Sequence, residues 1–136
     1  MVRSAARSAF PFVAGLFAVC AIIQVFLAGL GVFDDASAFI THRDFGYVIS
    51  VLPIVLVVLA LVGGMPRRFA GLSALLFVLF MLQSVFVAMR TSMPAVAALH
   101  PLNGFLILAL GIVLAWGSWQ ARTVSSAAAA ESSGSA

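Results

Sequence analysis

The stretch FITHRDFG, residues 39–46, shares its central feature with the stretch ALHPLNG, residues 98–104. Each holds one of the two histidines of the chain, His42 or His100, and a glycine four positions later, Gly46 or Gly104. Each also opens a long apolar run. Because residues four apart lie on one face of a helix, one turn apart, each histidine is expected beside a position without a side chain. Such a position lets a flat ligand lie against the helix.

The composition is that of an integral membrane protein. Of the 136 residues, 64% are hydrophobic and 8% are charged, and the mean hydropathy is +1.22. Since roughly a quarter of the residues of a soluble domain are charged, so much apolar surface needs the bilayer as its solvent. The seven basic residues are all arginines, which we interpret as anchors in the loops of a membrane protein, not as a nucleic-acid surface.

Four apolar runs predict four membrane-spanning helices, at about residues 10–33, 39–64, 72–89 and 95–119. Each run has roughly the 20 residues that cross a hydrocarbon core of about 30 Å, and none alternates like a strand of a membrane barrel. The predicted fold is therefore an all-α, integral membrane four-helix bundle over residues 1–122. The Ala- and Ser-rich residues 123–136 are predicted to form a disordered tail.

Local signals set the expected ends of these spans. Asp34 and Asp35 end the first span and are expected to cap the second. Pro53 is expected to kink the second span. Ser92 is a candidate cap for the fourth span, and Pro94 is expected at its start.

The arginines predict the orientation in the membrane. One side of the predicted bundle carries five of them, and the other carries Arg43 and Arg90 together with three aspartates. By the positive-inside rule, both termini are expected in the cytoplasm of a bacterial cell. His42 and His100 then lie near the outer face at similar depths, since spans two and four run in the same direction.

The two halves of the chain resemble each other. Gln24 precedes His42 by 18 residues, and Gln83 precedes His100 by 17 residues. Each half is thus a span with one glutamine, a polar loop, and a span opened by His-x-x-x-Gly. Such a parallel repeat relates its halves by an axis along the membrane normal, which would bring the two histidines toward each other across the bundle.

The histidine pair is interpreted as the two axial ligands of a heme iron, because neutral imidazole is a common heme ligand and bundles often take ligands from facing helices. Gly46 and Gly104 would admit the porphyrin, and Arg43 and Arg90 would pair with its propionates. Four phenylalanines would form the walls of the pocket: Phe39, Phe45, Phe86 and Phe105.

Other interpretations of these residues stay open. The histidines could bind a quinone or a metal ion, or could bond backbone carbonyls at helix starts. Gln24 and Gln83 could serve the pocket or tie spans together. Asn103 could orient a ligand or bond carbonyls that Pro101 leaves free.

Pro101, directly after His100, also affects where the helix of the fourth span is expected to begin. The residue before a proline disfavours the helical conformation, so His100 could cap this helix instead of lying within it. The aspartates could likewise join the histidines in a metal site, although capping and solvated loops explain them equally well.

The sequences HRDFGY, residues 42–47, and LHPLNG, residues 99–104, resemble those of an uncharacterised family of small four-span bacterial membrane proteins. More distantly, the two histidines opening the second and fourth spans are similar to one half of heme A synthase and to membrane cytochromes b. The resemblance implies a b-type heme between His42 and His100. It does not extend to synthase catalysis, because the chain lacks a second four-span half and has Ala38 and Phe39 where an acidic residue is expected.

The expected function is therefore heme binding, for electron transfer or heme handling. One heme near one face cannot carry electrons across the bilayer, so we expect a redox partner, a quinone or a larger membrane complex. Self-association into a homo-oligomer is left open. The alternatives are a non-enzymatic scaffold or accessory subunit without cofactor, and a quinone- or lipid-binding protein. The sequence contains no nucleophile–base pair and no phosphate-binding loop, which argues against stand-alone catalysis.

Overall fold

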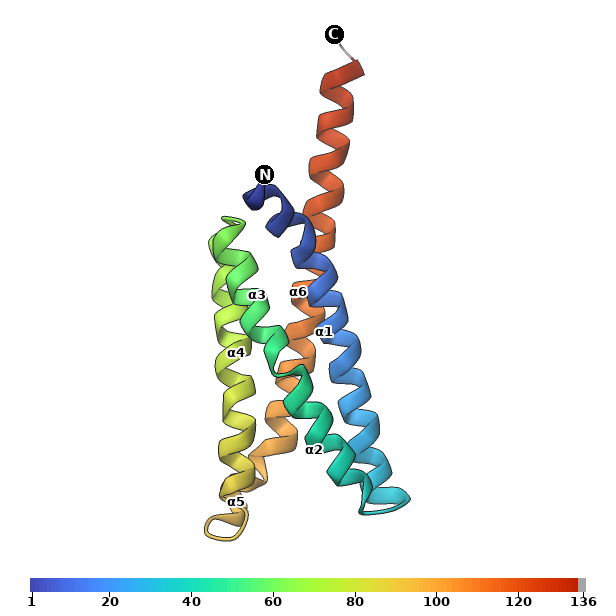
Figure 1. The fold of residues 1–136 in the computed structure, drawn as a ribbon, viewed down its shortest axis with the longest axis vertical. Coiled ribbons are helices and arrows are strands. Elements are labelled where there is room, and N and C mark those ends of the chain that lie inside the picture. The colour runs from blue at the N-terminus through green and yellow to red at the C-terminus, as the bar shows by residue number, and fades with distance from the viewer. Residues whose placement is uncertain (135–136) are drawn as a thin grey trace.

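The computed structural model of the chain describes residues 1–134, with side chains described for residues 1–123. This part is helical throughout apart from short turns (Figure 1). Its helices are α1 (Val2–Phe33), α2 (Ala38–Ile49), α3 (Val51–Val62), α4 (Arg67–Ala88), α5 (Pro94–Ala97) and α6 (Leu99–Gly134).

Four helical stretches are long and apolar enough to cross a membrane. They are Val2–Phe33, Ala38–Val62, Arg67–Ala88 and Pro94–Thr123. The prediction of an all-α bundle with four spans is confirmed.

Both ends of the bundle are more helical than the sequence predicts. α1 begins at Val2, well before the expected residue 10, because Ala and Arg in this segment favour helix. At the other end α6 continues to Gly134. The predicted disorder of residues 123–136 stays a prediction, since the side chains from residue 124 onward, and all of residues 135–136, lie outside the described residues.

The second span breaks at Ser50, where α2 ends and α3 begins. Pro53 causes this break, because it has no N–H for the carbonyl of Ile49 and its ring crowds that carbonyl. The hydroxyl of Ser50 donates a hydrogen bond of 2.7 Å to the carbonyl of Tyr47. The predicted kink is confirmed, and it changes the direction of the span (Figure 1).

The loop signals are confirmed in part. Asp34 follows the last residue of α1, as expected, but Ser37, and not Asp34 or Asp35, occupies the capping position before α2, and it makes no side-chain capping bond. Oδ1 of Asp35 accepts a hydrogen bond of 2.7 Å from the backbone N–H of Ser37, which lowers the pKa of this carboxyl and orders the turn before α2. Pro94 begins α5, as predicted, but Met93 and not Ser92 occupies the capping position before it. Proline suits this place because the first N–H of a helix has no partner within the helix.

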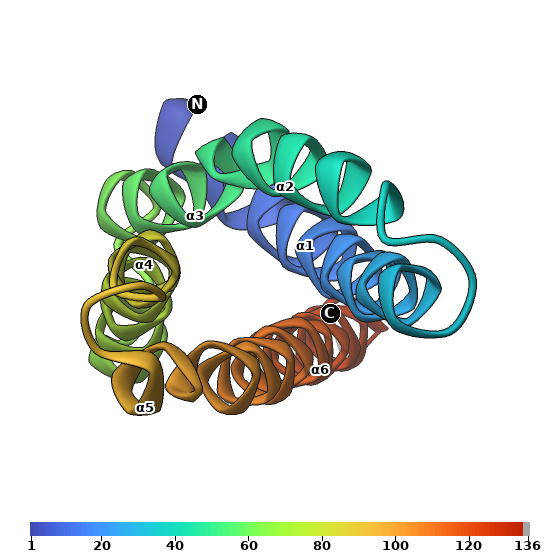
Figure 2. The same ribbon diagram turned by 90° about the horizontal axis from the view of Figure 1, so that it is seen from below.

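The four spans form a ring (Figure 2). The first span packs against the second and the fourth, and the third span packs against the second and the fourth. α1 and α6 approach closely at Gly111, where an added Cβ would lie 2.9 Å from the ring of Phe17. The ring of Phe17 is fully buried, so only a residue without a side chain fits there.

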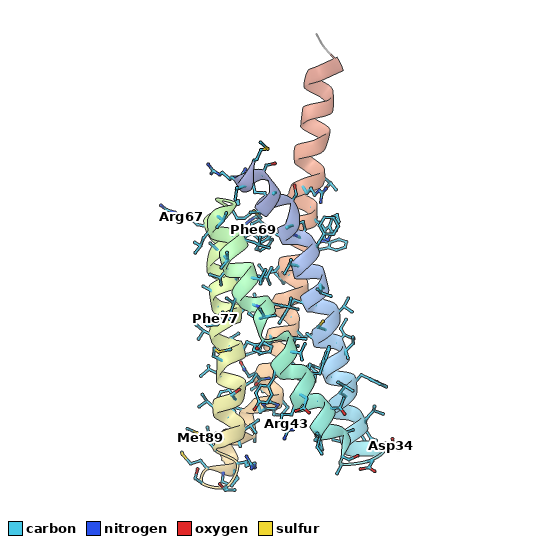
Figure 3. The ribbon with its side chains drawn as sticks, viewed as in Figure 1. Asp34, Arg43, Arg67, Phe69, Phe77 and Met89 are labelled. Carbon is cyan, nitrogen blue, oxygen red and sulfur yellow. The ribbon has the colours of Figure 1, made fainter. Side chains whose placement is uncertain are left out.

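The two ends of the bundle differ in charge. One end, here called the basic end, carries five exposed arginines: Arg3, Arg7, Arg67, Arg68 and Arg122. The other end, here called the histidine end, carries both histidines with Asp34, Asp35, Arg43, Asp44 and Arg90. Figure 3 labels Arg67 at the basic end, and Asp34, Arg43 and Met89 at the histidine end.

The hydrophobic core lies in the half of the bundle nearer the basic end. It is built around the fully buried side chains of Phe10, Phe17, Leu56, Leu76 and Leu114. Toward the histidine end, Gly31 is the only buried residue between residues 22 and 48, and no residue from 77 to 102 is buried. Within the described chain the backbone of α2 does not come close to that of α4 or α6. The spans therefore diverge at the end that holds the histidines (Figures 1 and 2).

Candidate cofactor site between two histidines

His42 lies in the first turns of α2 and contacts the preceding span. Its ring nitrogen Nδ1 lies 3.0 Å from the backbone carbonyl oxygen of Gln24 in α1. A carbonyl oxygen only accepts hydrogen bonds, so Nδ1 must carry the proton in this contact. In a neutral imidazole with this tautomer, the other ring nitrogen, Nε2, has a lone pair, as in a metal-binding histidine whose N–H bonds a carbonyl.

His100 makes the same contact in the second half of the chain. Its Nδ1 lies 3.3 Å from the backbone carbonyl oxygen of Gln83 in α4. The spacings that suggested a repeat, 18 residues and 17 residues, thus correspond to one contact made twice. The alternative that the histidines bond backbone carbonyls is confirmed in part: the carbonyls are those of Gln24 and Gln83, within the preceding spans and not at helix starts.

His100 lies in the first turn of α6, directly before Pro101. The N–H groups of a first turn have no carbonyl to bond within their helix, so a proline there costs no hydrogen bond. The sequence left open whether His100 caps the helix or lies within it. The structure places it within.

The rings of His42 and His100 face each other across the bundle. Their centroids lie 6.2 Å apart and their planes are inclined by 72°. Both side chains are half-buried. The predicted approach of the two histidines is present, and it joins the hairpin of spans one and two to that of spans three and four.

The glycines have a different neighbour from the one expected. A Cβ on Gly46 would lie 2.7 Å from Nε2 of Gln24, and a Cβ on Gly104 would lie 3.3 Å from Nε2 of Gln83. The expected open face beside each glycine is therefore wrong, because the glutamine of the preceding span occupies it. The glycines let each span pair pack closely enough for the histidine to reach the glutamine carbonyl.

The two glutamines differ in their hydrogen bonds. Nδ2 of Asn103 donates to Oε1 of Gln83 at 3.0 Å and to the carbonyl of Leu79 at 2.8 Å. In the first half Phe45 stands at the corresponding position, three residues after the histidine. Oε1 of Gln24 is buried and has no partner in the described part of the chain. Asn103 thus serves α4, not the carbonyls near Pro101.

The two arginines of the histidine end are both exposed. Nε of Arg43 donates to Oδ1 of Asp44 at 2.8 Å, and Nη1 of Arg90 lies 3.4 Å from the carbonyl oxygen of Val87. Within residues 1–123 each histidine bonds a backbone carbonyl, and neither arginine bonds a histidine. Their pairing with a charged ligand group stays a prediction.

Of the four phenylalanines, Phe39 makes a ring contact with a histidine. Its ring packs against Gly31 and lies 6.5 Å from the ring of His42. Phe86 lines a groove between α4 and α6, while Phe105 is 60% exposed. One predicted wall residue therefore stands beside the site, and Phe105 faces outward.

A family model matches residues 24–91, half of the chain. The chain belongs to this family, a family of unknown function (DUF6220). The expectation of an uncharacterised family is confirmed, although the matched region ends before His100 and so does not reach the fourth span. No curated protein and no solved structure matches the chain, so the resemblance to heme A synthase and membrane cytochromes b has no support.

The DUF6220 chain offers few ligands for a bare metal ion. Over residues 1–123 no group of three or more His, Cys, Asp or Glu side chains comes together. Structural metal sites in proteins use about four protein ligands. The described residues therefore do not bring the aspartates to the histidines as the alternative metal site requires.

Proposed function

We propose that this DUF6220 protein is an integral membrane protein that binds one b-type heme between His42 and His100. The observation that supports this is the 6.2 Å separation of the two ring centroids. With about 2.0–2.1 Å between a metal ion and an imidazole nitrogen, two imidazoles on opposite sides of one ion have centroids about 6 Å apart. An inclination of 72° between the rings is compatible with axial ligation, which fixes the direction of each nitrogen and not the twist of the ring.

The hydrogen bonds of the rings support the same proposal. Each Nδ1 is held by a carbonyl of the neighbouring span, at 3.0 Å and 3.3 Å, so each Nε2 is left as the ligating atom. Such bonds to a backbone carbonyl fix the orientation of metal-binding imidazoles and raise their basicity. Both halves of the site are thus ordered before a ligand arrives.

The sparse packing of the histidine end provides a further argument. A bundle interior is normally filled by its own side chains to the density of an organic crystal. Here the core fills one half only, and the spans around the histidines bury Gly31 and almost nothing else. A flat apolar group between the two hairpins would supply the missing contacts.

The bound heme would supply one-electron chemistry, and the role we assign is electron transfer or heme handling. With both termini in the cytoplasm of a bacterial cell, the site lies near the outer face of the membrane. The exposed Arg43 and Arg90 stand at that face and are assigned to the propionates. A redox partner, a quinone or a larger complex would exchange electrons with the site.

A second candidate function is quinone or lipid binding. A groove between α4 and α6 is lined by Leu79, Leu106 and Asn103 among others, with a volume of about 210 Å³. A second groove of about 430 Å³ shares Leu79 and Leu106 with it. The pair of grooves forms one apolar strip that suits an isoprenoid or acyl chain.

The visible absorption spectrum of protein purified from heme-replete membranes tests the proposal. We expect the spectrum of low-spin, six-coordinate iron. His42→Ala and His100→Ala should each abolish it, while Arg67→Gln, at the opposite end of the bundle, should keep it. A colourless wild-type preparation would refute heme binding, and a quinone in its lipid extract would then favour the second function.

A further inference from the structure

The arginines of α1 are fixed against the turn between α3 and α4. Nε of Arg7 donates to the carbonyl of Gly63 at 2.6 Å, and its Nη2 donates to the carbonyl of Gly64 at 2.8 Å. Nε of Arg3 donates to the carbonyl of Gly63 at 3.3 Å. Gly64 has a positive φ of 57°, so it ends α3 in a left-handed turn that turns these carbonyls toward the guanidinium groups.

This turn leads directly into two more arginines. Arg67 and Arg68 open α4, three and four residues after Gly64, and both are exposed. Two arginines therefore bond this turn and two more follow it in the sequence, so that all four lie at the basic end, where Figure 3 labels Arg67. The guanidinium group of Arg68 lies over the ring of the buried Phe69, 4.7 Å from its centroid. Carbonyl oxygens accept hydrogen bonds from Arg3 and Arg7 without cancelling their charge.

No carboxylate opposes this charge among the described side chains. The three acidic residues of that part, Asp34, Asp35 and Asp44, all lie at the histidine end. Arg43 there forms an ion pair with Asp44 at 2.8 Å. Arg3, Arg7, Arg67 and Arg68 thus differ from Arg43, since they have no carboxylate partner among the described side chains.

The cluster lies at the depth of lipid headgroups. α4 has 22 residues, which gives a length of about 33 Å at 1.5 Å per residue, close to the hydrocarbon thickness of about 30 Å. Arg67, at the first residue of this span, is therefore at the boundary between hydrocarbon and headgroups. α4 also begins without a side-chain cap, and the partial positive charge of a helix start favours an anion.

We propose that the four arginines Arg3, Arg7, Arg67 and Arg68 form a binding site for the phosphate of an anionic phospholipid. Guanidinium groups hold phosphates by paired, charge-assisted hydrogen bonds, and basic pockets between membrane helices recognise anionic headgroups. The acyl chains of the lipid would lie along the exposed apolar surface of α3 and α4. This proposal is independent of the heme site, because it uses the opposite end of the bundle.

Native mass spectrometry of the full chain in detergent tests the proposal, with phosphatidylglycerol or phosphatidylcholine added. We expect wild-type protein to retain phosphatidylglycerol in preference to phosphatidylcholine. The double variant Arg67→Gln/Arg68→Gln should lose this retention several-fold, and Arg67→Lys/Arg68→Lys should keep more of it. Arg90→Gln is the matched control at the other end and should behave like wild type.

Thermal unfolding provides a second measurement that does not depend on the variants. Phosphatidylglycerol should raise the Tm of wild type, and high salt should reduce the rise because it screens exposed charges. Equal retention of both lipids, or a double variant that keeps phosphatidylglycerol like wild type, would overturn the proposal. Displacement of the lipid by an equal concentration of inorganic phosphate would show a site for free phosphate instead.

Discussion

Asn103 donates a hydrogen bond of 3.0 Å to Oε1 of Gln83, whereas Oε1 of Gln24, in the corresponding place of the first half, is buried without a partner in the described chain. The repeat therefore holds its two histidines through equal backbone contacts but supports the two glutamines unequally. The second half has a complete polar network of Asn103, Gln83 and the carbonyl of Leu79. The first half replaces the asparagine by Phe45.

The first prediction concerns this asymmetry. Asn103→Leu should lower the free energy of unfolding by about 1 kcal/mol, since it leaves Gln83 without its donor and bonds between membrane helices average about 0.6 kcal/mol, with a maximum of about 1.7. Gln83→Met should cost a similar amount. Gln24→Met, the matched change in the first half, should cost less, because the oxygen it removes has no partner. Reversible unfolding in mixed micelles measures all three, and a larger cost for Gln24→Met would contradict the asymmetry.

A second prediction concerns the contact between α1 and α6. Gly111→Ala should destabilise the bundle by about 1–3 kcal/mol, the usual cost of overpacking a well-packed core, because its Cβ would lie 2.9 Å from the fully buried ring of Phe17. Gly15→Ala in α1 is the control, since nothing lies within 4 Å of its Cβ. Alanine should stabilise that helix by up to about 1 kcal/mol. Thermal unfolding followed by circular dichroism compares the two, and equal Tm shifts would contradict the close packing at Gly111.

The hydrogen bonds of Arg7 to the turn after α3 give a third prediction. Arg7→Gln removes the donors to the carbonyls of Gly63 and Gly64, at 2.6 Å and 2.8 Å, and should cost about 1 kcal/mol, the net value of a typical hydrogen bond. Arg90→Gln, which loses one contact of 3.4 Å within its own helix, should have little effect. Hydrogen exchange at the turn after α3 should rise in the first variant only. An unchanged rate of hydrogen exchange at this turn would show that the hydrogen bonds of Arg7 do not order it.

Hydrophobicity alone predicted the four spans, because the bilayer selects for apolar runs of a fixed length. The approach of His42 to His100 was predictable because the two halves repeat, and the kink was predictable from Pro53. The neighbour of Gly46 was not, since a glycine only marks a missing side chain and the group that fills the space comes from another span. For the same reason the sequence did not show that Asn103 supports Gln83, or that Arg7 holds the turn at Gly63.

The last prediction tests whether His100 is an iron ligand by replacing it with methionine, another side chain that binds iron. It rests on the proposed heme site. If the two imidazoles bind iron, His100→Met should keep six-coordinate iron with one thioether ligand and should raise the reduction potential, because His/Met ligation gives higher potentials. His100→Leu, which has no ligating atom, should give five-coordinate iron or none. If His100 has only a structural role, both variants lose the contact of 3.3 Å to Gln83. Their spectrum and reduction potential should then equal those of the wild type. Redox titration of the purified variants, followed in the visible region, separates these two interpretations.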